Sequence, residues 1–300
     1  MKTPGLAALR ERLERHGFRP SRFRGQSFLA DGNLADAIVR DARLRPGENV
    51  LEVGCGPGAL TSRLARPGRR VLAVEIEPSL AEACEEAIGP GRGVEILRED
   101  VLAGKRRLAG AVEDRLPDLR PYVLVSNLPY AVAGPVLVEL ASAASPPERM
   151  IVMVQEEVAH RIAARPGARP YGPLSAALAV GWSAKILRRV PPEVFWPRPS
   201  VRSAVLRLVP REARPAPDLY RRHLGGIHLL FRWPRKGLRA VLREAGVPDA
   251  PGLLASLSLD PGKRLGELEE GELRRLALAV APADRPGESR SREERPSRSP

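Results

Sequence analysis

The tetrapeptide Asn127-Leu128-Pro129-Tyr130 combines a side-chain amide, a restricted backbone and an aromatic ring in four consecutive residues. It follows the apolar run 122–125, so we expect it at the end of a buried strand, where open α/β sheets bind their ligands. Pro129 has no N–H and biases Leu128 toward an extended conformation, which lets nearby carbonyls point into a pocket. These acceptors and the aromatic face suit a flat base with an exocyclic amino group. A simple strand-to-turn junction is the alternative interpretation.

A glycine-rich loop, 54–58, follows an earlier apolar run and would let the backbone approach a ligand closely. Its spacing is Gly-x-Gly-x-Gly, which differs from the Gly-x-Gly-x-x-Gly that a dinucleotide pyrophosphate prefers. Glu75, at the end of the next strand, can accept both ribose hydroxyls, and Asp100, at the end of the third, can accept from an adenine amino group. Together they predict a pocket for an uncharged adenosine that carries a polar group, such as S-adenosylmethionine. For either acid alone, a solvated strand-end carboxylate is the alternative.

The composition favours a nucleic-acid partner. The 300 residues carry 49 Lys and Arg against 36 Asp and Glu, a formal net charge of +13, and a basic protein most often binds a polyanion. Cys55 and Cys84 lack metal-type spacing, so neither a disulfide framework nor any metal site is expected. No apolar stretch has the length of a signal peptide or a membrane span. We expect a cytoplasmic protein that does not bind a membrane, and we expect it to be a monomer.

Short apolar strands alternate with helical segments along the first two thirds of the chain. The pattern predicts strands at 49–53, 71–74, 94–97, 122–125 and 149–154, and helices at 32–42, 59–65, 78–88, 155–164 and 174–180. Such alternation predicts an α/β fold with a parallel, doubly wound sheet, whose right-handed crossovers place the strand-end loops on one edge. Gln26, the glycine loop, Glu75, Asp100 and Asn127 then share one crevice.

Two late strands, 184–190 and 203–209, flank a proline-rich segment at 191–201 that must form an ordered loop or a lid. Beyond a linker at 210–217, helical segments at 218–231, 235–245 and 265–279 predict a small C-terminal helical domain. Its basic residues predict RNA contacts, and we assign these to Arg221, Arg222, Arg232, Arg235, Lys236 and Arg239.

Eight motifs occur in order along residues 25–209. They read G-Q-S-F-L, E-V-G-C-G-P-G-A-L-T, V-E-I-E, E-D-V, N-L-P-Y, Q-E-E-V-A-H-R, Y-G-P-L-S and P-P-E-V-F-W-P-R-P-S-V-R-S-A-V. In these motifs the chain resembles the ribosomal RNA adenine N6,N6-dimethyltransferases of the KsgA type. The resemblance implies a Rossmann-like class I methyltransferase fold with S-adenosylmethionine as donor. It also implies two methyl transfers to N6 of each of two adjacent adenosines near the 3′ end of 16S rRNA, during small-subunit maturation.

With this resemblance the chain divides into four predicted parts. These are a basic N-terminal arm at 1–24, the methyltransferase domain at 25–209, a helical RNA-binding domain at 210–281 and a disordered tail at 282–300. The expected partners are the small-subunit rRNA and the assembling small subunit. The chain departs from the family at Ser27, usually Asn, at Ala131, usually polar, and at 233–236, where Trp-Pro-Arg-Lys differs from the usual basic helix.

The family pattern also assigns roles to residues at matching positions. The donor pocket would comprise Gln26, Phe28, Leu29, Gly54, Gly56, Glu75, Ile76, Asp100, Val101 and Asn127. The target adenine would contact the catalytic residues Asn127, Leu128, Pro129 and Tyr130, with Phe195 on its other face.

The chemistry that this assignment requires is mainly positioning. The N6 lone pair of adenine is delocalised into the ring and is a poor nucleophile. The Asn127 amide oxygen and a carbonyl near Leu128 or Pro129 can hold the N6 hydrogens and direct the lone pair at a methyl group. A resistance-type adenine methyltransferase of large-subunit rRNA shares this chemistry, and a non-catalytic ribosome-assembly factor on the same fold is a second alternative. The glycine spacing disfavours a nicotinamide dehydrogenase.

Overall fold

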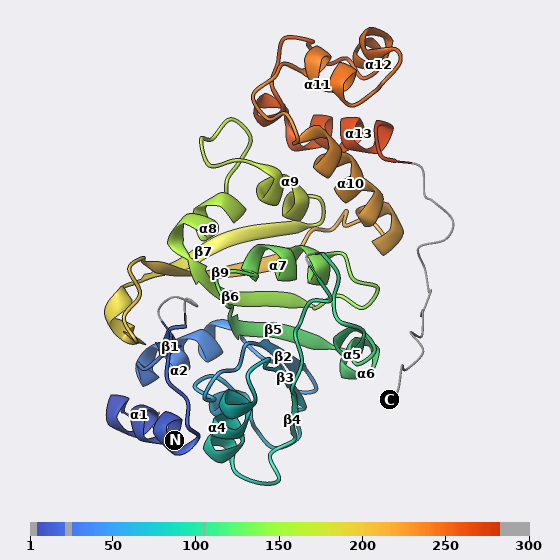
Figure 1. The fold of residues 1–300 in the computed structure, drawn as a ribbon. Coiled ribbons are helices and arrows are strands. Elements are labelled where there is room, and N and C mark those ends of the chain that lie inside the picture. The colour runs from blue at the N-terminus through green and yellow to red at the C-terminus, as the bar shows by residue number, and fades with distance from the viewer. Residues whose placement is uncertain (1–4, 22–25, 105, 283–300) are drawn as a thin grey trace, which may run out of the picture.

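The centre of the fold is a seven-stranded sheet with the order β4-β3-β2-β5-β6-β9-β7 (Figure 1). The computed structural model describes residues 5–21, 26–104 and 106–282. The strands are β2 (Asn49–Val53), β3 (Val71–Val74), β4 (Val94–Leu97), β5 (Tyr122–Asn127), β6 (Arg149–Gln155), β7 (Trp182–Val190) and β9 (Ser203–Pro210). The first five in this order pair in parallel, as predicted, whereas β9 pairs antiparallel with both β6 and β7. The two late strands therefore add an antiparallel edge to the parallel sheet.

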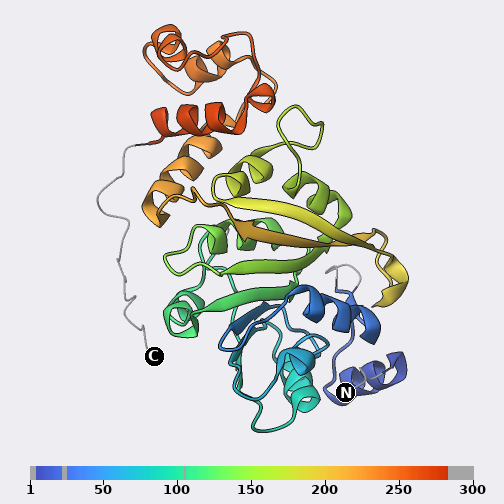
Figure 2. The same cartoon turned by 180° about the vertical axis from the view of Figure 1, so that it is seen from behind.

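Helices cover both faces of this sheet, so the central strands are apolar on both sides. Leu124 of β5 packs into a cluster that includes Leu137 of α7 (Ala133–Ala141), while the preceding residue Val123 packs into one that includes Ile38 of α2 (Gly32–Asp41). All four side chains are fully buried. Successive strand residues point to opposite faces, which places α7 and α2 on opposite sides of the sheet (Figures 1 and 2).

The other helices of this part are mostly short. They are α3 (Thr61–Leu64), α4 (Pro78–Ile88), α5 (Gly110–Glu113), α6 (Leu116–Leu119), α8 (Glu156–Ile162) and α9 (Pro173–Ala179). The sequence pattern predicted α4 with its observed bounds, since Pro78 starts the helix at a position where no N–H is needed. It missed α7, whose first turn contains Gly134 and Pro135. Proline fits a first helical turn, so this turn resembles a loop in sequence only.

The N-terminal segment packs against the sheet domain. Helix α1 (Leu6–Arg15) buries Leu9 and Leu13 in a cluster with Phe18, Phe28 and Leu80 of α4. This basic segment, which the sequence suggested as an arm, is thus a helix docked on α4 over its described residues.

A two-residue strand joins two distant segments of the chain. Strand β1 (Phe28–Leu29) pairs antiparallel with β8 (Phe195–Trp196), with Phe28 opposite Trp196 and Leu29 opposite Phe195. The short 3-10 helix η1 (Pro192–Val194) precedes β8, so the predicted proline-rich loop or lid is ordered.

The C-terminal part consists of helices, as predicted. They are α10 (Pro217–Leu230), α11 (Leu238–Glu244), α12 (Ala250–Ser256), η2 (Leu265–Glu267) and α13 (Glu270–Ala279). The pattern missed α12, which is short and begins at Ala250-Pro251-Gly252. Helices α10 and α13 cross closely, because a Cβ on Gly226 would lie 1.9 Å from the carbonyl oxygen of Ala277.

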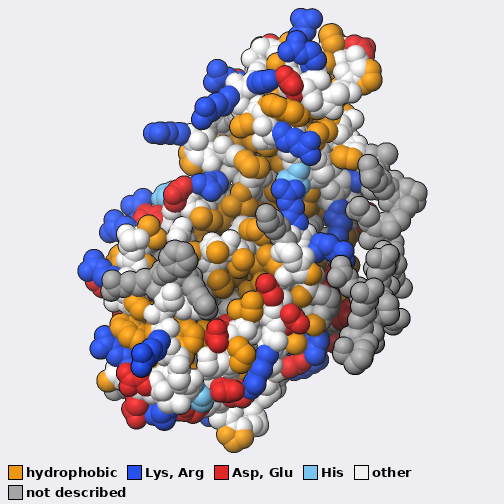
Figure 3. All heavy atoms as spheres, viewed as in Figure 1, with side chains coloured by type: hydrophobic (Ala, Val, Ile, Leu, Met, Phe, Trp, Pro, Cys, Tyr) orange, Lys and Arg blue, Asp and Glu red, His pale blue; other side chains and the backbone are white. Residues whose placement is uncertain are grey.

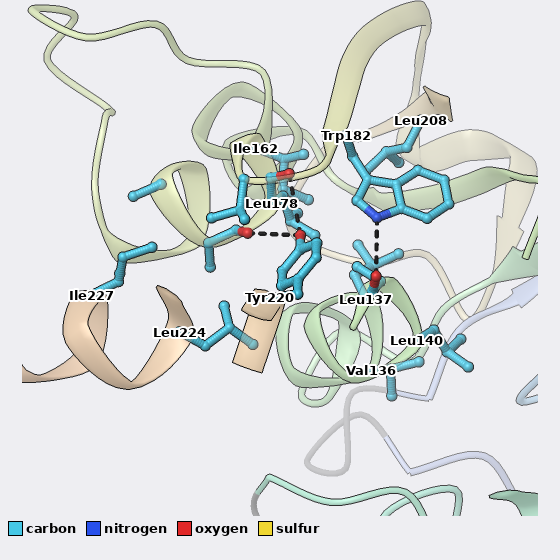
Figure 4. Close-up of a cluster of buried hydrophobic side chains, with 14 of the residues drawn as sticks. Val136, Leu137, Leu140, Ile162, Leu178, Trp182, Leu208, Tyr220, Leu224 and Ile227 are labelled. Atoms are coloured by element: carbon cyan, nitrogen blue, oxygen red, sulfur yellow. Dashed lines mark hydrogen bonds between the residues drawn. The ribbon is translucent and has the colours of Figure 1, made fainter. Parts of the chain in front are cut away.

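One buried contact region fixes the C-terminal helices on the sheet domain (Figure 4). The Tyr220 hydroxyl of α10 donates to the Ala177 carbonyl of α9 at 2.8 Å, and Leu224 and Ile227 of the same helix join the main core cluster. Trp182 lies beside this contact and donates its indole N–H to the Ala141 carbonyl at 3.2 Å. The α/β core and the C-terminal helices therefore form one continuous apolar core.

Two properties of the described residues bear on the sequence predictions. None of their helices is both long enough and apolar enough to cross a membrane. They also contain no group of three or more His, Cys, Asp or Glu side chains placed to hold a metal ion. The predicted disordered tail lies outside the described residues, apart from Pro282.

Candidate active site

The glycine loop after β2 and the acceptor motif after β5 touch each other. Gly54 has φ +70° and donates its N–H to the Val74 carbonyl at 2.7 Å. A Cβ at this position would lie 2.7 Å from Cγ of Pro129, closer than real Cβ contacts allow. Only glycine fits this left-handed, crowded position without moving its neighbour. The predicted donor loop and the predicted acceptor motif are therefore adjacent walls of one site.

Glu75 is held beside the glycine loop by backbone groups. Its side chain is buried, and its two carboxylate oxygens accept the Gly56 N–H at 2.9 Å and the Glu77 N–H at 3.1 Å. Burial raises the pKa of Glu75, and the backbone N–H groups oppose that rise because they stabilise the ionised form. Each oxygen retains a lone pair, so the carboxylate can still accept ribose hydroxyls.

The residue next to Glu75 offers an apolar surface. Ile76 is 65% exposed, which is unusual for a large aliphatic side chain beside a buried carboxylate. At the end of β4, Asp100 is exposed and accepts the Leu102 N–H at 3.0 Å, whereas Val101 is buried. This pair supplies a fixed acceptor and an apolar side chain, which together match the two needs of an adenine ring.

The segment around β1 reaches the same loop. The Phe28 ring lies against Gly56, where an added Cβ would be 3.2 Å from its Cδ1 atom. Leu29 is buried, and Gln26 accepts the Ser21 N–H at 2.9 Å through its side-chain oxygen. Phe28 therefore contacts the predicted donor loop directly, while the Gln26 side chain in this structure bonds to the Ser21 backbone.

Asn127 carries a buried acceptor that no described residue satisfies. Its Oδ1 atom has no hydrogen-bond partner among the described residues. The neighbouring Ser126 shows the ordinary situation, because its hydroxyl donates to the Val53 carbonyl at 2.6 Å. Leu128 is fixed by its N–H, which donates to the Met153 carbonyl at 3.1 Å. A buried unpaired acceptor costs free energy, so its presence at a strand end indicates that a ligand donor completes it.

The two predicted aromatic contacts differ in their surroundings. Tyr130 is half-buried, its hydroxyl lies 2.7 Å from Oγ of Ser203, and burial raises its pKa. Phe195 is only 4% exposed and packs with the core cluster that contains Leu29. The β1–β8 pairing brings Phe195 next to the donor-side segment, yet its ring lies in the core, and its contact with a base stays a prediction.

One contact to the site was not visible in the sequence. Arg12 of α1 donates from Nη1 to the Pro57 carbonyl in the glycine loop at 3.2 Å. Its side chain is only 13% exposed, and its Nε lies 3.8 Å from Glu86 of α4. In the sequence this segment is only a run of positive charge, and no local pattern indicates that Arg12 turns inward.

A second missed feature lies beneath the glycine loop. Glu52, the last but one residue of β2, is 2% exposed, and its Oε2 atom has no partner among the described residues. Burial raises the pKa of Glu52 well above its ordinary value, because a buried carboxylate loses its hydration. The thiol of Cys84 in α4 donates to Thr61 at 3.4 Å nearby. Glu52 therefore belongs to the buried support of the loop.

The six basic residues assigned to RNA binding all lie on the surface of the C-terminal part, in α10, in α11 or in the segment between them. Arg221, Arg222, Arg232, Arg235, Lys236 and Arg239 are exposed. Lys236 pairs with Glu244 at 2.5 Å, and Arg221 lies 3.9 Å from Glu113. None of the six contributes to the pocket around Gly54 and Asn127, so their contact with RNA stays a prediction.

Comparisons with known proteins identify the family of the chain. A sequence model of the family described as ribosomal RNA adenine dimethylase matches residues 17–280. The chain is 36% identical over 290 residues to the ribosomal RNA small subunit methyltransferase A of Geobacillus kaustophilus, which covers 93% of this chain and 97% of the relative.

Two solved structures share the fold. A dimethyladenosine transferase from Plasmodium falciparum superposes with a TM-score of 0.65 at 21% identity, over 81% of this chain and 94% of that one. The 23S rRNA methyltransferase ErmE gives 0.59 at 23% identity, over 85% and 99%. At these identities the likeness shows the fold alone, which is the predicted Rossmann-like class I methyltransferase fold. The match of the family model and the identity to the curated relative show that the chain belongs to the ribosomal RNA adenine dimethylase family.

Proposed function

We propose that the enzyme dimethylates N6 of two adjacent adenosines near the 3′ end of small-subunit rRNA. Its family makes it a ribosomal RNA adenine dimethyltransferase, with S-adenosylmethionine as the methyl donor. The choice of the small subunit is supported by the curated relative, which is named for that substrate. The observation that carries the proposal is the buried, unpaired Oδ1 of Asn127 beside the glycine loop.

The residues around the loop fit the donor. When bound, S-adenosylmethionine supplies an electrophilic methyl group on its sulfonium. Glu75 would accept the ribose hydroxyls with its remaining lone pairs, and Ile76 would cover one face of the adenine ring. Asp100 would accept the adenine amino group, and the absence of side chains at Gly54 and Gly56 would let the ligand approach the backbone of the loop. Gln26, Phe28, Leu29 and Val101 would complete the walls.

The acceptor side would act by holding the target amino group. Asn127 Oδ1 would accept one N6 hydrogen, and the carbonyl of Leu128 would accept the other. We favour Leu128 over Pro129, because the Pro129 carbonyl already accepts the Val132 N–H at 3.1 Å. N6 would then attack the methyl carbon, the bond from that carbon to sulfur would break, and N6 would lose a proton to solvent. Tyr130 and Phe195 would hold the base on its two faces.

The second transfer to the same N6 needs a pocket that accepts one methyl group and keeps one acceptor contact. We assign RNA docking to the six basic residues of the C-terminal helices, within the predicted four-part division of the chain. We also propose that the enzyme is a cytoplasmic monomer that acts on assembling small subunits.

The experiment that tests the proposal uses unmethylated small subunits and labelled donor. After incubation, reverse transcription should stop at two adjacent adenosines near the 3′ end, because dimethyladenine cannot pair normally. Unmethylated large subunits are the matched control. Stops confined to the large subunit would replace the proposal by the resistance-type activity. Donor binding by calorimetry without any methyl transfer would favour a non-catalytic assembly factor.

A further inference from the structure

We infer that a groove next to Tyr130 binds the base of the nucleotide adjacent to the adenosine being methylated. The groove has a volume of about 350 Å³ and is lined by residues of the acceptor motif, α7, α8, α9 and α10. This size falls in the usual range of small-molecule pockets. The inference rests on the proposed function, because it concerns the same RNA substrate.

The position of the groove relates it to the acceptor motif. Tyr130 is the residue that both share, and its hydroxyl is anchored on Ser203, which fixes the ring as a wall between them. Tyr130 is three residues from Asn127 and also lines the groove, so a nucleotide next to a base held at Asn127 can enter it.

The floor of the groove is apolar and suits a flat ring. Pro135 and Val138 of α7 face Leu174 of α9 across it, and a Cβ added to Gly134 would lie 3.5 Å from a methyl group of Leu174. Figure 3 shows hydrophobic side chains gathered on this face of the molecule, below the C-terminal helices. An unstacked base recovers stacking free energy on such a surface, whatever its identity.

Charged groups stand around the groove in the arrangement that a nucleotide needs. Arg106 and Arg161 line it from two different segments, and cations beside a groove attract the phosphates on either side of a bound base. His228 lines it from a third segment, and burial lowers the pKa of its imidazole. Arg161 also pairs with the exposed Glu157 on its own helix, which keeps its guanidinium at the surface. Two arginines beside an apolar floor match a nucleotide, which carries anionic phosphates next to a flat base.

One acid lines the groove as well. Glu139 of α7 is half-buried, and burial raises the pKa of its carboxyl. Arg106 acts on Glu139 in the opposite direction, since a nearby positive charge favours the ionised form. In either protonation state the carboxyl can accept from an exocyclic amino group of a base. The proposed occupant is accordingly an unstacked nucleobase with an amino group, such as the second adenosine of the pair.

The contact between α9 and α10 fixes the residues at one end of the groove. His228 comes from α10, and Tyr220 of the same helix is bonded to Ala177, which also lines the groove. The C-terminal helices thus contribute a wall to a site that begins at the acceptor motif. The C-terminal helices would therefore help to bind the substrate at the site, in addition to attracting RNA by their charge.

The test measures whether the effect of removing one base from the RNA depends on the residues of the groove. Small subunits are reconstituted with rRNA whose ligated 3′ segment carries either the natural nucleotide or an abasic nucleotide next to the target adenosine. Binding of the full-length enzyme is measured by filter retention. For the natural enzyme, the abasic nucleotide should weaken binding about 5- to 150-fold, the range for one stacked base.

A groove-filling variant should abolish that difference. Gly134→Leu places a side chain toward Leu174 and should bind both kinds of subunit equally weakly, whereas the matched control Gly134→Ala should behave as the natural enzyme. Leu174→Ala removes an apolar wall without a clash and should shrink the difference too. Donor binding measured by calorimetry should be unchanged in all three variants, which separates groove effects from misfolding.

Two results would overturn the inference. If the abasic nucleotide weakens binding equally in the natural enzyme, Gly134→Leu and Leu174→Ala, the base does not occupy the groove. If it weakens binding in none of them while the natural enzyme still methylates the subunits, the neighbouring base makes no contact there, and the proposed function stands alone. A natural enzyme that neither binds nor methylates small subunits would overturn both proposals.

Discussion

Two neighbouring residues of β5 should respond to alanine substitution in opposite ways. Ser126 is fully buried, and its hydroxyl satisfies the Val53 carbonyl at 2.6 Å. Asn127 presents a buried Oδ1 with no partner among the described residues. We predict that Ser126→Ala destabilises the fold and leaves the chemistry of the folded enzyme nearly intact. We predict that Asn127→Ala leaves the fold as stable or more stable and removes the chemistry.

The magnitudes follow from the contacts. Ser126→Ala leaves the Val53 carbonyl without its partner, which should lower the free energy of unfolding by about 1–3 kcal/mol. Asn127→Ala removes an unsatisfied acceptor and relieves a penalty of about 1–3 kcal/mol. The substitution also removes packing contacts of the Asn127 side chain, which reduces that gain in stability by about 1 kcal/mol. The net change for Asn127→Ala should therefore lie between about 0 and 2 kcal/mol in favour of the folded state.

The loss of activity should be much larger than the change in stability. By comparison with other single hydrogen-bonding groups that act in a transition state, Asn127→Ala should reduce kcat by about 100- to 1000-fold. Labelled-methyl transfer to unmethylated small subunits measures this loss, and urea denaturation without donor measures stability. Donor affinity by calorimetry should fall only modestly. Activity of Asn127→Ala within about threefold of the natural enzyme, or a destabilisation equal to that of Ser126→Ala, would refute the reasoning.

Three further substitutions test the supports of the site. Arg12→Ala removes the bond to the Pro57 carbonyl and should raise KM for the donor severalfold with kcat little changed, as steady-state rates at varied donor will show. Burial raises the pKa of Glu52 in the folded protein. As pH rises through the ordinary pKa range of a carboxyl group, Glu52 therefore loses its proton in the unfolded chain before it does so in the folded protein. Stability should therefore fall as pH rises through that range, and the advantage of Glu52→Gln in thermal melts should grow as the pH rises above the ordinary pKa of a carboxyl group. Tyr220→Phe leaves the Ala177 carbonyl without that donor and should lower the free energy of unfolding in urea by about 1–3 kcal/mol.

The sheet and its functional edge could be predicted because their signals are local. Each parallel strand is a short apolar run bounded by polar or turn residues, and the predicted bounds of β2, β3 and β4 match the observed ones. Strand-end residues then share an edge by topology alone. The contact between Gly54 and Pro129 is a consequence of that rule, since β2 and β5 are neighbours in the sheet.

The parts that could not be predicted depend on contacts between segments distant in sequence. Nothing in the two-residue run Phe28–Leu29 indicates that it will pair with Phe195–Trp196. The groove beside Tyr130 is likewise lined by residues from four helices and from the loop that contains Arg106. One of these helices, α7, was not predicted, because Gly134 and Pro135 in its first turn are residues typical of loops. Such features depend on how distant segments pack together, and the periodicity of apolar residues along one segment does not indicate that packing.

The roles of the positively charged residues could not be predicted from the sequence either, and they differ between the two ends of the chain. Arg15 of α1 and the following residue His16 contact Glu86 of α4, and Arg12 lies beside the same carboxylate. These contacts hold α1 against the donor side of the site. In the C-terminal part, Arg222, Arg232, Arg235 and Arg239 are exposed, and within the described residues no acid pairs with them. Charge that remains unpaired at a surface is available to phosphates, so salt should weaken RNA binding through the C-terminal helices and leave the attachment of α1 less affected.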